Sequence, residues 1–221
     1  MSVTAVLPAL DEAEAIGTVV RGLLGLVDEV VVADNGSTDG TGELARAAGA
    51  RVVREPRRGF GAACFAGASS ATGDVLVFLD ADGSFAPHDA LRIAAPVLDG
   101  RLDLSLGSRM HAGNAIAPWL RVANGTLGAC VRLAGGPFLR DIGPLRAIRR
   151  QTLLGLEVRD RAQAWPLEMV IRAARAGLRI GELPVDYLPR LGGESKVTGT
   201  VGGSLRAARQ MSRLLVAEAF R

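Results

Sequence analysis

The chain alternates between short, unbroken apolar runs and longer segments in which apolar residues recur every three or four positions. The unbroken runs predict buried strands, because strands covered on both faces lack a polar side. The periodic segments predict helices with one apolar face. In the first half of the chain, strands are expected at residues 3–7, 29–33, 51–54, 75–79 and 102–106. Helices are expected between them, at residues 11–24, 41–50, 61–71 and 88–98.

This alternation of strand and helix predicts an α/β domain with a mostly parallel central sheet flanked by helices. In such sheets, ligands bind beyond the carboxyl ends of the strands. Asp34 follows the second expected strand, and Asp80 and Asp82 follow the fourth. We therefore expect these acidic residues at the ligand-binding edge of the sheet.

The second half of the chain is less regular. Helices are expected at residues 118–133 and 165–176, and an extended segment at 178–185. Residues 137–148 are interrupted by Gly and Pro, residues 190–196 form a Gly-rich loop, and residues 205–220 predict a final basic helix. No internal repeat and no linker is evident, so residues 1–221 are expected to form a single domain.

Composition places the chain among globular proteins without a membrane span. With 221 residues and 48% hydrophobic residues it can bury a sizeable core. The N-terminus has no basic region before its apolar stretch, unlike a secretory signal. The longest charge-free run, residues 59–73, is shorter than the ~20 apolar residues that a spanning helix needs. Cys64 and Cys130 lack metal-site spacing, so we expect reduced core cysteines and a cytoplasmic protein.

The net charge of +3 hides an asymmetry between the two halves. Residues 1–100 carry a net charge of −7 and residues 101–221 a net charge of +10. This distribution indicates a cation site in the first half and an anion site in the second, unless the arginines simply form a solvated surface. Lys196, in the Gly-rich loop, is the only lysine beside 25 arginines.

Asp80 and Asp82 suggest a metal site. In an extended backbone, residues two positions apart point to the same face, so the two carboxylates repel each other unless a cation lies between them. Such hard oxygen ligands suit Mg²⁺ or Mn²⁺, which typically bind through one or two carboxylates and substrate phosphates. Loop acids that only make turns are the alternative interpretation.

Two other acidic turns fall at the same edge. In the segment DNGSTDGT, Gly36 permits a tight turn and Asp39 or Thr41 can cap the next helix. A turn does not require Asp34, whose carboxylate can accept hydrogen bonds from the N–H edge of uracil or guanine. Asp11 and Glu12 open the first helix, where acids are ordinary dipole partners or can hold ribose hydroxyls.

These motifs, in this order, resemble glycosyltransferase family 2 with the GT-A fold. The matching segments are LPALDE, DNGSTDGT, RRGFGAA, GDVLVFLDADGS, GSR at 107–109, DIGPLRAI at 141–148 and ELPVDYLPRLGGESKV at 182–197. The last is similar to that of polyprenyl-phosphate (dolichol-phosphate-type) hexosyltransferases, some of which lack transmembrane helices. The resemblance implies inverting, metal-dependent transfer of a hexose from a GDP-mannose- or UDP-glucose-type donor to an acceptor, with polyprenyl phosphate as the leading acceptor.

The resemblance also implies roles for individual residues. Residues 1–107 become the nucleotide-sugar and metal half, and residues 108–221 the acceptor half. Asp80 and Asp82 would hold the metal, while Arg190, Ser195 and Lys196 would close on the diphosphate. The candidate nucleotide-sugar-binding residues are Pro8, Leu10, Asp11, Glu12, Asp34, Gly36, Gly61, Asp80, Ala81, Asp82 and Ser195. The sequence departs from the family at Ser84, where a polar amide is common, and at Asp11, where Asn is usual.

The chemistry of the acceptor decides what the second half must supply. A lipid phosphate is already an anion and needs cations to position it. The candidate cations are Arg109, Arg121, Arg132, Arg140 and Arg146. A hydroxyl acceptor needs a general base, for which Glu168 and Asp141 are the candidates, and these join Asp82, Arg190 and Lys196 as predicted catalytic residues.

Several alternatives remain open or are disfavoured. A soluble small-molecule or natural-product acceptor and a non-catalytic nucleotide-sugar-binding module are both retained. A dinucleotide-binding oxidoreductase is disfavoured because Cys64 stands where the third glycine belongs. Nucleic acid is not an expected partner, because the basic half has few aromatic residues. The basic C-terminal helix can lie on the inner face of a membrane or pack on its own sheet.

Overall fold

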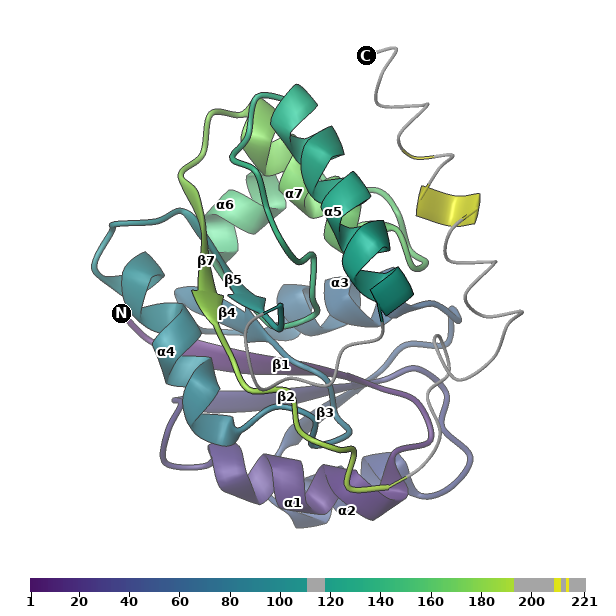
Figure 1. Ribbon diagram of the computed structural model, residues 1–221. Coiled ribbons are helices and arrows are strands. Elements are labelled where there is room, and N and C mark those ends of the chain that lie inside the picture. Colours follow the sequence, from purple (N-terminus) through teal and green to yellow (C-terminus); the bar gives the residue numbers. More distant parts are fainter. Residues whose placement is uncertain (111–117, 193–208, 212–213, 215–221) are drawn as a thin grey trace.

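The computed structural model describes residues 1–110, 118–192, 209–211 and 214. One sheet of seven strands has the order β3-β2-β1-β4-β6-β5-β7 (Figure 1). The strands are β1 Val3–Ala9, β2 Glu29–Asp34, β3 Arg51–Arg54, β4 Val75–Phe78, β5 Leu104–Ser108, β6 Arg146–Arg149 and β7 Ile180–Pro184. Only β6 runs against its neighbours, so the predicted mostly parallel sheet is confirmed.

Helices cover both faces of the sheet (Figure 1). One face carries α1 Ala13–Leu23, α2 Thr41–Ala47 and α4 Pro87–Leu98. The other carries α3 Phe60–Ser70, α5 Pro118–Leu133, α6 Arg150–Gly155 and α7 Trp165–Arg175. Strand alternation divides the core in two: Ala5 and Leu7 of β1 join the first hydrophobic cluster and Val6 joins the second.

The structure differs from the sequence-based elements at three places. Strand β1 continues through Pro8, which is tolerated because β4 pairs only with the preceding residues Val3–Val6. Strand β5 lies two residues later than expected. Strand β6 and helix α6 were not predicted, because the segment RAIRR has no apolar periodicity and β6 is defined by long-range pairing with β4 and β5.

The described part of the C-terminal region packs on the protein itself. Met211 and Leu214 contact the second hydrophobic cluster, and the N–H of Gln163 donates to Gln210 Oε1 at 3.1 Å. Most of the expected helix 205–220 lies outside the described residues, as do Ser195 and Lys196. Within the described residues, no helix has the length and apolar character needed to cross a bilayer.

Candidate functional site

The turns after β1 and β2 are hydrogen-bonded to each other at the carboxyl edge of the sheet. The N–H of Asp11 donates to Ser37 Oγ at 3.0 Å, and the N–H of Thr38 donates to Asp11 Oδ1 at 2.9 Å. Beside them, the N–H of Glu12 donates to Thr41 Oγ1 at 2.9 Å. Asp11 has a positive φ of 51°, which non-glycine residues seldom adopt. Asp11 therefore joins the two turns with one of its carboxylate oxygens.

Asp34 lies next to this junction. Strand register pairs it with Ala9, and Pro8 and Leu10 flank Ala9 at the end of β1. Its Oδ1 accepts the N–H of Ser37 at 2.8 Å, in a turn in which Gly36 has a φ of 83°. The structure thus brings the predicted nucleoside-binding residues of both turns together at one edge.

Asn35 has a structural role that the sequence analysis did not assign. Its Nδ2 donates to the carbonyl oxygens of Glu55 and Arg57 at 3.1 and 2.7 Å, and its Oδ1 accepts the N–H of Gly59 at 2.7 Å. These three bonds fix the segment after β3 against the end of β2. Asn35 lies within the turn motif DNGSTDGT. Because asparagine is also common in ordinary turns, the sequence alone did not indicate this role.

Gly61 serves the packing of α3. Its N–H donates to the carbonyl of Ala162 at 3.0 Å, and a Cβ at position 61 would lie 2.7 Å from the carbonyl oxygen of Asp160. The close approach of segment 160–162 explains why glycine is required there. Contact of Gly61 with a nucleotide-sugar stays a prediction.

Asp80 and Asp82 follow β4 as expected, and their environments differ. Burial, with a contribution from the charge of Asp82, raises the pKa of Asp80 to about 7. The side chain of Asp80 takes part in no hydrogen bond or ion pair within the described residues. Asp82 is almost fully buried, and its Oδ1 accepts the N–H of Ser84 at 2.9 Å. Ala81 points into the first hydrophobic cluster, so only its backbone is available to a ligand.

The donor atoms at this edge fit a hard divalent cation. The carboxylates of Asp80 and Asp82 are followed in the same loop by Ser84, whose hydroxyl is buried and has no hydrogen-bond partner in the described structure. Among the described residues, no three His, Cys, Asp or Glu side chains cluster as metal ligands. An ion at Asp80 and Asp82 would therefore complete its coordination with water or substrate oxygens, as Mg²⁺ commonly does.

Arg190 reaches the carboxylates from the segment after β7. Its Nη1 lies 2.5 Å from Asp82 Oδ2, and its Nη2 lies 2.7 Å from Glu12 Oε1. Burial alone would lower the pKa of Arg190, but the two carboxylates outweigh it and raise the pKa. A residue 108 positions away from Asp82 is thus placed against it. The expected role of Arg190 in closing on a diphosphate stays a prediction.

Arg109 forms a second cationic group at the end of β5. Its guanidinium binds Asp141 through two bonds of 2.8 and 2.9 Å and stacks over the ring of Tyr187, 5.2 Å from the centroid. Asp141 is fully buried, and both its oxygens accept from Arg109. Its carboxylate therefore positions Arg109 in this structure, and its role as a general base stays a prediction.

Glu182 is a further residue that sequence reasoning missed. Its carboxylate accepts the backbone N–H groups of Arg140 and Asp141 at distances between 2.8 and 3.0 Å. Glu182 therefore ties β7 to the segment that carries Asp141. Glu182 and Tyr187 both lie in the segment ELPVDYLPR, and its resemblance to the family motif was the sequence feature that could have indicated their roles.

Glu168, the other candidate base, is buried among internal partners, and its role as a base stays a prediction. It is 2% exposed and accepts the N–H groups of Arg159 and Asp160, at 3.1 and 2.6 Å. Arg172 Nε lies 2.7 Å from its other oxygen. The carboxylate holds the segment before α7 to the helix, because every partner comes from that segment or from α7 itself.

Arg146 lies inside the protein. Its side chain is fully buried, its Nη1 donates to the carbonyl of Pro166 at 2.9 Å, and its Nη2 donates to that of Gly143. Burial lowers its pKa to about 10. These contacts favour a structural role for Arg146. Its acceptor role stays a prediction, as do those of Arg121 and Arg140, which are exposed.

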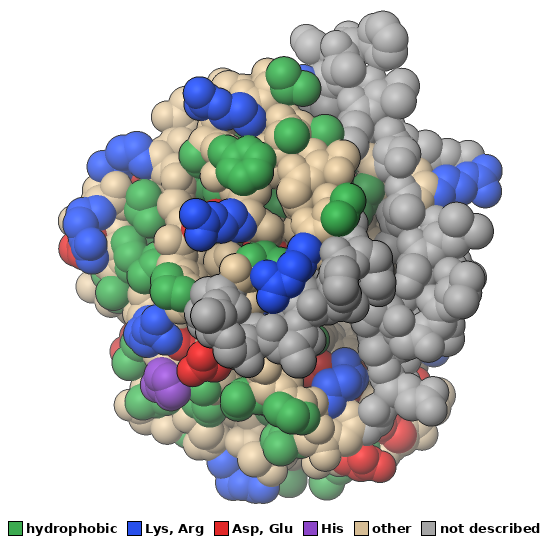
Figure 2. Space-filling model, viewed as in Figure 1, with side chains coloured by type: hydrophobic (Ala, Val, Ile, Leu, Met, Phe, Trp, Pro, Cys, Tyr) green, Lys and Arg blue, Asp and Glu red, His purple; other side chains and the backbone are tan. Residues whose placement is uncertain are grey.

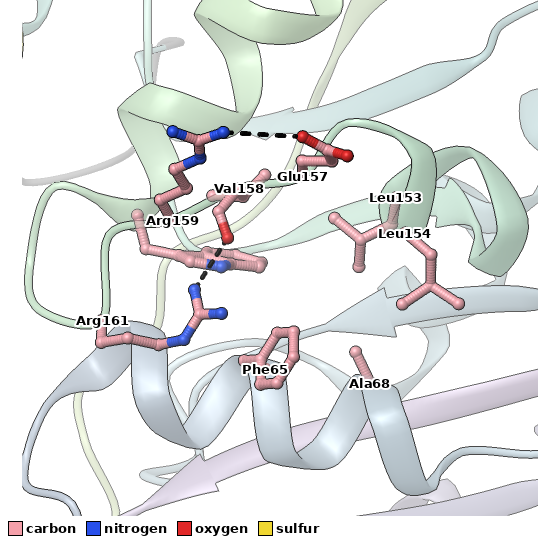
Figure 3. A pocket seen from close by; sticks show the side chains of 9 residues that line it. Phe65, Ala68, Leu153, Leu154, Glu157, Val158, Arg159 and Arg161 are labelled. Carbon is pink, nitrogen blue, oxygen red and sulfur yellow. Dashed lines mark hydrogen bonds and ion pairs between the residues drawn. The ribbon is translucent and has the colours of Figure 1, made fainter.

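A separate cavity of about 300 Å³ lies between α3, α6 and the start of α7 (Figure 3). Its lining is mainly apolar, with Phe65, Leu154 and Trp165 among its side chains. Arg161 stacks on the ring of Phe65, 3.9 Å from its centroid. None of the lining residues belongs to the carboxylate site, so this cavity lacks the chemistry expected for a nucleotide diphosphate.

Sequence comparison identifies related proteins over most of the chain. The family "Glycosyl transferase family 2" matches residues 4–155. An uncharacterized glycosyltransferase of Mycobacterium tuberculosis is 42% identical over 207 residues, covering 93% of this chain and 94% of the relative. An undecaprenyl-phosphate mannosyltransferase of Micrococcus luteus is 31% identical over 221 residues, covering 92% and 90%.

Structural comparison gives a consistent result. Glucosyl-3-phosphoglycerate synthase from Mycobacterium tuberculosis, in complex with phosphoglyceric acid, has a TM-score of 0.78 and 25% identity. The alignment covers 98% of this chain and 79% of that one. The same enzyme has been solved with Mn²⁺, UDP and glucosyl-3-phosphoglycerate, and that structure has a TM-score of 0.76 to this chain.

Proposed function

The chain belongs to glycosyltransferase family 2 and has the GT-A fold, and from this premise we propose that it transfers a hexose from a nucleotide diphospho-sugar to a phosphate-bearing acceptor, with a polyprenyl phosphate as the leading candidate. The donor is of the GDP-mannose or UDP-glucose type, and transfer inverts the anomeric centre. Residues 1–221 form one catalytic domain, with the donor half at residues 1–107 and the acceptor half at 108–221. Strands of both halves share a single sheet, which supports one domain.

One observation carries the proposal: Asp80 and Asp82 lie at the end of β4, and Arg190 contacts Asp82 directly. Two acids and an arginine at the carboxyl edge of a parallel sheet match the needs of a metal-bound diphosphate. When bound, Mg²⁺ or Mn²⁺ supplies Lewis-acid stabilisation to the departing diphosphate. Mn²⁺ in the structural neighbour supports a divalent ion here.

The chain's own residues would orient the donor and balance its charge. In this proposal Asp34 and the joined turns bind the nucleoside, and Arg190 binds the diphosphate through its planar fork. Ser195 and Lys196, which follow Arg190 in the sequence, are proposed to assist it. Asp141 and Glu168 are both engaged by other protein groups, which favours an acceptor that is already an anion.

The related proteins support a phosphorylated acceptor. The Micrococcus luteus relative is named for undecaprenyl phosphate, and the structural neighbour was solved with phosphoglyceric acid. These acceptors share a phosphate group and differ in whether a lipid carries it. The second candidate function is therefore transfer to a soluble phosphorylated acceptor, which the TM-score of 0.78 to the phosphoglycerate enzyme favours.

An exposed surface of the acceptor half favours the lipid. We call it the α5 surface, and it comprises Arg121, Val122, Arg132, Leu133, Phe138 and Arg140. Val122, Leu133 and Phe138 are 72%, 89% and 58% exposed. Figure 2 shows hydrophobic and basic side chains interspersed over α5 and its surroundings, whereas acidic side chains lie mainly over the N-terminal half. Such a surface is suited to peripheral contact with an anionic membrane, together with the basic C-terminal segment.

The proposal is tested by thermal stability against a panel of GDP- and UDP-sugars, with and without Mn²⁺. A ligand at about 100 times its dissociation constant stabilises the folded protein by roughly 2.7 kcal/mol. We expect a metal-dependent shift with one nucleotide, its loss in Asp82→Ala, and its retention in Asp99→Ala, where the lost carboxylate is exposed and pairs with Arg101. If no nucleotide-sugar shifts the transition, the transferase proposal fails and a non-catalytic function becomes the better interpretation.

The acceptor is then identified by turnover. Polyprenyl phosphate, unphosphorylated polyprenol, phosphoglycerate and glycerol are compared with the donor that gave the shift. Transfer to polyprenyl phosphate alone supports the leading candidate, and transfer to phosphoglycerate supports the second. Equal transfer to the unphosphorylated compounds would contradict a phosphate-bearing acceptor.

A further inference from the structure

Arg190 occupies the position in which a cation would be expected. Its guanidinium bridges Asp82 and Glu12 with distances of 2.5 and 2.7 Å, and the two carboxylates are 3% and 11% exposed. Asp82 already uses Oδ1 to accept the N–H of Ser84. Both oxygens of Asp82 therefore already have a partner, and a cation at Oδ2 would lie against the positive charge of Arg190 unless Arg190 moved.

The segment that carries Arg190 is bound to the loop that carries Asp82. The N–H of Leu188 donates to the carbonyl of Ser84, and the N–H of Leu191 donates to that of Asp82, both at 2.9 Å. Gly83 has a φ of 77°, and a Cβ there would lie 2.5 Å from Leu191 Cδ1. These contacts hold the backbone in place, so the guanidinium can leave Asp82 by side-chain rotation alone.

Glu12 provides the second anchor of the guanidinium. It stands at the N-cap position of α1, yet its side chain makes no capping hydrogen bond. Its carboxylate instead accepts from Arg190, which comes from the other end of the chain. Arg190, which is 178 residues from Glu12 in the sequence, is thereby held between the first βα turn and the acidic pair.

We propose that Arg190 is a latch that excludes a free divalent cation from Asp82 until a nucleotide diphosphate offers the guanidinium a replacement partner. The inference rests on the proposed function, since it concerns the same donor site. A free ion must displace a tethered positive charge, which opposes its binding. A diphosphate attracts the arginine fork and adds oxygen ligands for the metal, so metal and nucleotide bind cooperatively.

The test measures Mn²⁺ binding to the complete chain without nucleotide, from the electron paramagnetic resonance signal of free Mn²⁺. We expect weak binding to the wild type and at least about tenfold tighter binding to Arg190→Gln, because a positive charge beside the ion is removed. In Arg190→Lys, which keeps the charge but not the fork, the gain should be smaller. Adding Asp82→Asn to Arg190→Gln should abolish the gain and so locate the ion.

Arg92→Gln is the matched control. Arg92 Nη1 also lies 2.5 Å from a buried aspartate, Asp89, but it lies on α4. An equal gain in this control, or unchanged Mn²⁺ affinity in both Arg190 variants, would overturn the latch. The wild type should bind Mn²⁺ more tightly when UDP or GDP is added, and Arg190→Gln should show less of this coupling. Failure of the wild type to bind any nucleotide would overturn the proposed function, whereas the nucleotide-free comparison reports on the latch separately.

Discussion

The donor half and the acceptor half use their charged residues in opposite ways. At the carboxyl edge of β1, β2 and β4, Asp34 and Asp80 lie where strands end. In the acceptor half, Arg146 and Glu168 are buried and hold the backbone together. The difference teaches that a charged residue at a strand end is a stronger functional signal than a charged residue in an irregular segment.

Topology explains this contrast. Parallel strands joined by helices bring all their carboxyl ends to one edge, so the position of an acid along the sequence predicts its position in space. Strand β6 breaks this regularity, because it enters antiparallel between β4 and β5. Charged residues around β6 are then placed by long-range packing, and some are enclosed in the core.

The largest effect on stability is expected at Arg146, and it tests whether this residue is structural. Arg146→Met leaves the carbonyl oxygens of Pro166 and Gly143 without their donor in the core. A buried acceptor without a partner costs about 1–3 kcal/mol, so we expect the free energy of unfolding to fall by about 3 kcal/mol in urea denaturation.

Arg140→Met is the control for this substitution, because the side chain of Arg140 is exposed. Its stability should change by no more than about 0.5 kcal/mol. If Arg146→Met kept wild-type stability and instead lost the ability to use the acceptor, the structural role of Arg146 would be contradicted.

A smaller effect is expected at Glu168, where the two roles predict different measurements. As a structural carboxylate, Glu168→Gln loses charge-assisted hydrogen bonds to Asp160 and Arg172, which lowers the free energy of unfolding by about 2 kcal/mol. If Glu168 were a general base, the Glu168→Gln substitution would lower kcat by about 100-fold or more and alter the pH–rate profile. We expect the loss of stability with the pH–rate profile unchanged, and Glu157→Gln, on an exposed carboxylate nearby, should do neither.

Much of the donor half could be predicted from the sequence. The apolar runs predicted the bounds of β2 and β3 to within one residue. The positions of Asp34 and Asp82 after apolar runs predicted that both lie at the carboxyl edge of the sheet. The resemblance associated Arg190 with the same donor site as Asp82, but it did not predict their direct ion pair. Nor did it predict the engagement of Glu12 by the same arginine, because a side-chain contact over 178 positions leaves no local pattern.

The acceptor half was less predictable for physical reasons. Arg140 and Arg146 stand six residues apart in one Gly- and Pro-containing segment, and no local property separates them. One is exposed and the other fully buried, because only the second faces α7 from a central strand. Asp141 looked like a free acid until its bidentate contact with Arg109 was seen.

The smallest effect is expected at the α5 surface, and it sharpens the role of the acceptor half. Each arginine near an anionic bilayer contributes about 1 kcal/mol, so Arg121→Gln or Arg132→Gln should weaken binding to vesicles containing anionic lipid by about fivefold. Adding Phe138→Ser to either arginine variant should weaken vesicle binding further, because an exposed apolar ring is lost. Arg101→Gln, on an arginine outside this surface, should bind like the wild type in the same vesicle sedimentation assay. If binding is absent, or is equal for neutral and anionic vesicles, the exposed charges of the acceptor half do not serve a membrane, and the soluble phosphorylated acceptor gains support.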